Sequence, residues 1–147
     1  MTPNELRAHL LPLLAAQPNL QVWDGPPGDG TTSLGYLPGG RDVALDTDGR
    51  AHMYAALYVG TGARSLQDER LSATGGTRVV TFQVTAAGGD ANRALRAAEK
   101  VLTALEGVPV TGGGVIRLDF DPGPPRVDRE PSPSRHYLPL MFRVALG

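Results

Sequence analysis

The stretch TRVVTFQVTAAGGDANRALRAAEKVLTALEG, residues 77–107, decides the fold. In its first part, apolar side chains at Val80, Phe82 and Val84 alternate with threonine and glutamine. A period of two residues is typical of a β-strand that buries one face and leaves the other in water. We therefore predict a strand over residues 77–87 within an antiparallel sheet.

The second part of the same stretch predicts an amphipathic helix over residues 90–106. Asp90 is a favourable N-cap because its carboxylate can accept hydrogen bonds from the free N–H groups of the first turn. Gly107 closes the helix and Pro109 prevents its continuation. The predicted apolar stripe consists of Ala94, Leu95, Ala98, Val101, Leu102 and Leu105.

The remaining sequence predicts a second helix and further strands. An N-terminal helix begins at Thr2, which has capping-box spacing to Glu5, and Pro12 is expected to kink or shorten this helix. Residues 26–50 are weakly patterned, apart from a predicted turn at Asp46-Thr47-Asp48-Gly49. Further strands are predicted over residues 20–23, 52–59, 115–120 and 137–146.

These elements together predict one α+β domain over residues 1–147. We expect a mainly antiparallel sheet of four or five strands, with two helices packed on one face and long loops. Strands without a helix between every pair argue against a doubly wound parallel sheet. Residues 60–76 and 121–136 are too long for simple connections, and the second segment is rich in proline.

Composition narrows the function classes. The chain has 147 residues, a formal net charge of −1, no cysteine, 19 glycines and 13 prolines. Near-neutral charge argues against general nucleic-acid binding, and the lack of cysteine excludes disulfides, thiolate metal sites and cysteine nucleophiles. The sequence has no apolar run of membrane-spanning length and no signal-peptide pattern at its start. We therefore expect a soluble cytoplasmic protein, or part of a particle assembled in the cytoplasm, without membrane contact.

Motifs for known chemistry are incomplete. Gly60-Thr61-Gly62 resembles the start of a dinucleotide fingerprint, but the following residues leave no room for the helix that would hold phosphate. Asp42, Asp46 and Asp48 lack the bidentate glutamate of a calcium loop. The three histidines lack zinc-site spacing, and the sequence has no Gly-x-Ser-x-Gly elbow. We therefore expect no enzyme, metal or cofactor.

Charged residues in the two long connections are the candidate functional residues. For any single one of them, solvated loop charge is an equally good interpretation. Together they indicate protein–protein contact, because arginine is enriched at interfaces and the interspersed carboxylates weaken the field that nucleic acid would need. Tyr54, Tyr58 and Tyr137 are interpreted as strand residues, of which one or two could be interface aromatics. The candidates are Arg64, Asp68, Glu69, Arg70, Arg126, Arg129 and Arg135.

An ordered set of short segments resembles a known family, the tail terminator (tail-completion) proteins of siphophages that infect GC-rich actinobacteria. The resemblance spans most of the chain, its specificity lies in the order of the segments, and residues 26–50 match poorly. The segments are Val22-Trp23-Asp24-Gly25, Tyr54-Ala55-Ala56-Leu57-Tyr58-Val59-Gly60, Asp68-Glu69-Arg70-Leu71-Ser72, Phe82-Gln83-Val84-Thr85, Gly88-Gly89-Asp90, Asn92-Arg93-Ala94-Leu95 and Ser134-Arg135-His136-Tyr137-Leu138-Pro139-Leu140-Met141-Phe142-Arg143-Val144.

The resemblance implies a structural role in the bacteriophage virion. Such proteins form a hexameric ring that caps the tail tube, ends tail polymerisation and presents a surface to the head–tail connector. The implied partners are further copies of the chain, the tail tube protein and the connector or stopper protein, assembled in the host cytoplasm. Three alternatives stay open: another head–tail neck subunit, such as a stopper or connector; a small-ligand-binding or peptide-binding α+β domain; and an enzyme with an unrecognised site.

Overall fold

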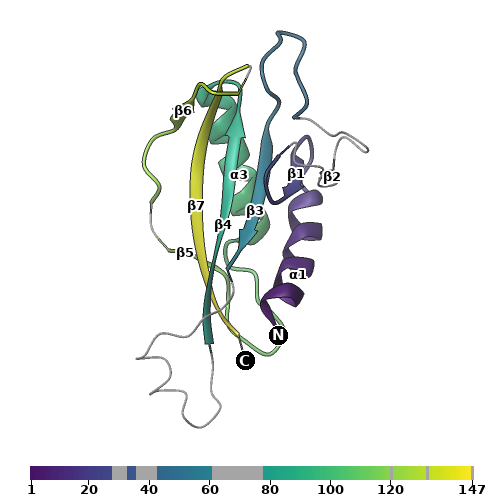
Figure 1. Cartoon of the computed structure of the whole chain (residues 1–147). Coiled ribbons are helices and arrows are strands. Elements are labelled where there is room, and N and C mark those ends of the chain that lie inside the picture. Colours follow the sequence, from purple (N-terminus) through teal and green to yellow (C-terminus); the bar gives the residue numbers. More distant parts are fainter. Residues whose placement is uncertain (28–32, 36–42, 61–77, 120, 132, 147) are drawn as a thin grey trace.

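The computed structural model of the chain is a single α+β unit in which two helices lie against one open sheet (Figure 1). It describes residues 1–27, 33–35, 43–60, 78–119, 121–131 and 133–146, and for residues 33–35 the backbone only. The predicted fold class is confirmed, including the mainly antiparallel sheet and the two helices on one face. The predicted loop over residues 60–76 lies almost entirely outside the described residues.

The sheet has the strand order β2-β1-β3-β4-β7-β5, and β6 also pairs with β7. All described strand pairs are antiparallel except β1 with β3, which run parallel. The sheet exceeds the predicted four or five strands because β2, β5 and β6 contain only two or three residues each. The strands are β1 (Gln21–Asp24), β2 (Ser33–Gly35), β3 (Tyr54–Val59), β4 (Arg78–Gly88), β5 (Arg117–Leu118), β6 (Arg126–Asp128) and β7 (Arg135–Leu146).

The longest ladder joins β4 to β7, from Arg78 opposite Leu146 to Gly88 opposite His136. On its other side, β7 pairs with β6 near its start and with β5 near its end. Pro139 lies on β7 between these two short partners. The segment over residues 121–136, predicted as one long loop, therefore contributes a strand to the sheet, and that part of the prediction is wrong.

Both helices begin as predicted. Helix α1 (Pro3–Ala15) starts with a complete capping box, in which the Thr2 side chain accepts from the Glu5 backbone N–H and the Glu5 side chain accepts from the Thr2 N–H. The helix continues three residues beyond Pro12. The lost hydrogen bond would have joined Pro12 to Ala8, and Ala8 is exposed, so water can bind the free carbonyl.

Helix α3 (Ala91–Leu105) has Asp90 as its N-cap, and the Asp90 side chain accepts from the Arg93 backbone N–H. Most of the predicted apolar stripe faces the sheet, but Leu95 is 47% exposed and does not belong to it. Ala97 and Ala104 are buried instead, because α3 lies close to the sheet and small side chains fit there. Figure 1 shows α3 running along β4 and β7, with α1 beside β1 and β3.

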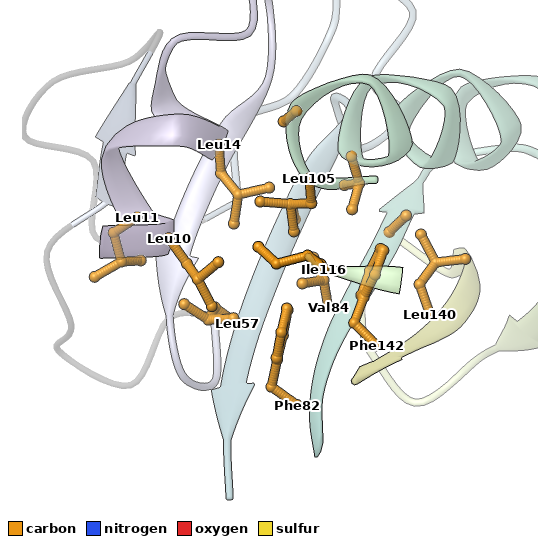
Figure 2. Close-up of a cluster of buried hydrophobic side chains, with 14 of the residues drawn as sticks. Leu10, Leu11, Leu14, Leu57, Phe82, Val84, Leu105, Ile116, Leu140 and Phe142 are labelled. Atoms are coloured by element: carbon orange, nitrogen blue, oxygen red, sulfur yellow. The ribbon is translucent and has the colours of Figure 1, made fainter. Parts of the chain in front are cut away.

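The main core lies between the helices and one face of the sheet (Figure 2). The predicted buried face of β4 is confirmed, since Val80, Phe82 and Val84 are at most 1% exposed. Phe82 stacks on Phe142 of β7, with ring centroids 5.3 Å apart and the ring planes 14° apart. Leucines from α1, together with Leu57, Leu105 and Ile116, enclose this pair of rings.

The other face of the sheet is covered at one end only. There Trp23, Tyr54 and Ala56 form a second buried cluster with residues from 43–51 and with Ala87. Farther along the same face, Tyr58, Val79 and the polar side chains of β4 and β7 are exposed or half-buried. We call this uncovered part the open face. Among the described residues, no helix is long and apolar enough to cross a membrane.

Candidate functional site

A hollow of about 250 Å³ lies on this side of the sheet, where the buried Trp23 cluster gives way to the open face. We call it the tyrosine hollow. It receives side chains from β3, β4, β6 and β7, together with Pro27, which follows β1. Its lining residues are Pro27, Tyr54, Ala56, Tyr58, Thr85, Asp128, Arg135 and Tyr137.

Strand register explains why the hollow forms here. Alternation along β3 places Tyr54, Ala56 and Tyr58 on the same face, with the small Ala56 between two large rings. Ala56 lies opposite Thr85, another small side chain, so the centre of this surface stays low. Tyr137 on β7 adds a further aromatic wall. Small residues in the middle and tyrosines around them leave a cavity open to solvent.

Arg135 is the charged group most closely bound to this aromatic wall. Its guanidinium carbon lies 5.5 Å from the centroid of the Tyr54 ring, and its Nη1 donates to the Tyr54 hydroxyl at 3.3 Å. This geometry combines a cation–π contact with a hydrogen bond to a neutral group. The Arg135 Nε is buried and has no hydrogen-bond partner among the described atoms.

Two other half-buried arginines of the described chain have carboxylate partners. Arg7 pairs with Asp24, and Arg93 pairs with three aspartates. No such ion pair joins Arg135 to a carboxylate of the described residues. The Arg135 guanidinium is therefore partly removed from water without a described counter-ion, which is an unfavourable state for a cation.

Tyr54 and Tyr58 remain neutral hydroxyl donors at physiological pH, because the pKa of each is raised. Burial is the main cause that raises the pKa of Tyr54 above 10.0, and the nearby positive charge of Arg135 opposes this rise. Burial also raises the pKa of Tyr58, to which Tyr54 adds a smaller effect. Tyr54 accepts a hydrogen bond from Arg135, so its own proton is left to donate to an acceptor.

Asp128 brings the opposite charge to the rim. It lies directly across from Arg135 in the β6–β7 register, and its Oδ1 accepts from the Glu130 backbone N–H at 3.2 Å. That hydrogen bond holds the carboxylate toward the turn after β6. The hollow therefore presents a guanidinium, tyrosine hydroxyls and one carboxylate around a floor of small side chains with aromatic walls.

The predicted interface residues have three different outcomes. Arg126 lies on β6 and Arg129 in the turn after it, and both are exposed. Arg135 is half-buried and lines the hollow, as does Tyr137. The four remaining candidates lie outside the described residues: Arg64, Asp68, Glu69 and Arg70.

Asp128 was not among the predicted site residues. Its role depends on the pairing of β6 with β7, and a three-residue strand between prolines gives almost no periodic signal. The tyrosines of β3 could be recognised as possible interface aromatics, but their approach to Arg135 requires the register of three strands.

A second group of charges is structural. Arg93 of α3 donates to Asp46 at 2.7 Å, to Asp48 at 2.8 Å and to Asp90 at 2.5 Å. His52 Nδ1 also lies 2.7 Å from Asp46. These bonds attach the turn at residues 46–49 to the start of α3.

Asp46 and Asp48 of this turn thus have the guanidinium of Arg93 as their partner, which supports the predicted surface turn rather than a calcium loop. Asp42 lies outside the described residues. Within the described part of the chain, no group of three or more metal-binding side chains is present.

Comparison of the chain with models of known protein families, with curated proteins and with solved structures found no match.

Proposed function

We propose that this chain is a structural virion protein of the tail terminator type. In this role it would form a ring, hexameric in the family it resembles, that caps the tail tube, ends tail polymerisation and joins the tail to the head connector. The proposal starts from the ordered segments that resemble this family. The structural observation that supports it best is the open face, which leaves one side of a rigid sheet available for contact with other proteins.

The chemistry of the open face suits a contact between subunits. Val79 is 47% exposed and lies opposite Ala145 on β7, so an apolar strip reaches the surface at the end of the long β4–β7 ladder. Arg143 and Thr81 are exposed beside it. Interface cores combine apolar contact with arginine, and a surface of this kind that meets a different surface of the next copy can close a ring.

The proposed partners follow from the same role. Further copies of the chain form the ring, the tail tube protein lies on one side of it and the connector or stopper protein on the other. The exposed Arg126 and Arg129 beside β7 are proposed contacts for one of these neighbours. Assembly is proposed to take place in the host cytoplasm, and the finished protein resides in the virion neck and performs no catalysis.

A deletion and complementation experiment tests this role. Deleting the gene should give filled heads beside unjoined tails of irregular or excessive length, as seen by negative-stain microscopy. The wild-type chain should restore joined particles. Val79→Glu should fail to do so and should reduce the oligomer mass measured by light scattering, because it places a charge in the apolar strip.

Leu95→Glu is the matched control, because Leu95 is equally exposed but lies on α3, away from the open face. Both variants must first show wild-type unfolding transitions. Equal complementation by Val79→Glu and Leu95→Glu would refute the proposed contact. Tails of normal length that fail to join would instead identify the chain as another neck subunit.

A further inference from the structure

We propose that the tyrosine hollow binds an aspartate or glutamate side chain of a partner protein. The inference rests on the donors around the hollow and on the lack of an ion pair between Arg135 and any carboxylate of the described residues, and it does not depend on ring formation. It therefore goes beyond the proposed assembly role and can be tested on the purified chain alone.

The first argument is the set of unused donors. A guanidinium has five N–H groups, and only one from Arg135 has a described acceptor, the hydroxyl of Tyr54. Because that hydroxyl accepts from Arg135, its own proton can be donated to another acceptor, and Tyr58 contributes a second phenol at the wall. A carboxylate carries two oxygens with several acceptor positions, so it can bind the guanidinium and a tyrosine hydroxyl together.

The second argument is the environment of the charge. Tyr54 is 5% exposed, and its ring lies against the guanidinium, so the cation is partly shielded from water. A charge-assisted hydrogen bond in such surroundings is stronger than the same bond at a fully solvated surface. A volume of about 250 Å³ can accept one acidic side chain with its adjoining backbone.

Asp128 gives the proposal a second, opposite test. Its carboxylate repels an incoming anion, although the Glu130 N–H partly neutralises it. Two charges several ångströms apart at a solvated rim interact by less than about 1 kcal/mol, which corresponds to a few-fold change in affinity. Removing the charge of Asp128 should therefore strengthen the binding of an acidic side chain, whereas removing the charge of Arg135 should weaken it.

The experiment is a peptide titration of the purified chain, followed by NMR of ¹³C-labelled tyrosine rings and ¹⁵N-labelled arginine side chains. The probes are Ac-Ala-Glu-Ala-NH₂ and its glutamine and lysine analogues. The glutamate peptide should shift the signals of Arg135 Nε and of the Tyr54 and Tyr58 rings, with an affinity about tenfold above that of the glutamine peptide.

Three variants complete the test. Arg135→Gln should abolish the preference for glutamate, and Asp128→Asn should increase glutamate affinity two- to threefold. The control is Arg96→Gln, which removes one exposed arginine charge from α3, on the helix side of the sheet, and should change neither value.

Several results would overturn the proposal. Equal affinity for the glutamate and glutamine peptides would show that the hollow does not recognise the negative charge of a carboxylate. Tighter binding of the lysine peptide would show that the hollow binds cations. Absence of saturable shifts with all three peptides would show that the hollow does not bind side chains. Shifts of the same signals on simple dilution of the protein would show that a second copy, not another protein, occupies the hollow.

Discussion

Replacing Asp90 tests how the start of α3 is stabilised. In the structure, the Oδ1 of Asp90 accepts from the Arg93 backbone N–H at 2.8 Å, and Oδ2 accepts from Arg93 Nη1 at 2.5 Å and from Arg50 Nη1 at 3.2 Å. Loss of an N-cap costs about 1 kcal/mol of unfolding free energy. The ion pairs are partly exposed and Arg93 keeps Asp46 and Asp48, so they add about 0.5 kcal/mol.

Asp90→Ala should therefore lower the free energy of unfolding by about 1.5 kcal/mol and Tm by about 5 °C. Asp90→Asn keeps a side-chain acceptor for the cap and loses only the charge, so it should cost about 0.5 kcal/mol. Urea unfolding can be followed by fluorescence of Trp23, the sole tryptophan, which is fully buried. Glu99→Ala, at an exposed position of the same helix, is the control and should stay close to the wild type.

The pH dependence of the unfolding free energy supplies an independent check on the role of Asp90. The hydrogen bond from the Arg93 backbone N–H is the main cause that holds the pKa of Asp90 below 3.8 in the folded chain. A carboxyl with a lowered folded pKa stabilises the protein above its unfolded pKa and loses this contribution as pH falls through the folded value. The difference between the wild type and Asp90→Asn should thus be constant above about pH 5 and shrink below pH 4. Equal losses for the alanine and asparagine variants, or a loss below 0.5 kcal/mol for alanine, would refute this account of the helix start.

Two further predictions concern close contacts and titration. Gly89→Ala should lower the free energy of unfolding by about 1–3 kcal/mol, because a Cβ there would lie 2.5 Å from the Cβ of Arg50 and 2.6 Å from the backbone nitrogen of Ala51. Urea unfolding measures this loss, and an unchanged midpoint would contradict the prediction. Arg135→Gln should raise the pKa of Tyr54 further, because in the wild type the positive charge of Arg135 lowers this pKa and so opposes the effect of burial. A pH titration between pH 8 and 12, followed by ¹³C NMR of the tyrosine ring, measures the pKa. An unchanged or lower pKa would contradict the prediction.

Local signals in the sequence were sufficient for the helices and long strands. Asp90 and Thr2 cap their helices through contacts within three residues. The apolar and polar residues around Phe82 alternate because one face of this strand is buried and the other is not. Such features depend on near neighbours along the chain, so the sequence contains nearly all of the information that fixes them.

The short strands and the candidate site depended on distant parts of the chain. Strand β6 exists because β7 offers it an edge, and the parallel pairing of β1 with β3 brings together strands separated by about thirty residues. Arg135 lies beside Tyr54 only after β3, β4 and β7 have taken their register. A pattern of two or three residues cannot predict such pairings, because tertiary contacts decide them.

Pro139 limits how a further strand could add to the edge of β7. Met141 and Ala145 accept hydrogen bonds from Asp119 and Gly114, so the odd-numbered residues of this strand direct their backbone groups away from β4. Pro139 belongs to the same series but has no N–H, and it lies where neither β5 nor β6 pairs with β7. An added strand would find a missing donor at the centre of this edge. A second copy of the chain that met this edge could therefore not extend the sheet across Pro139, and its contact there would have to use side chains and turns.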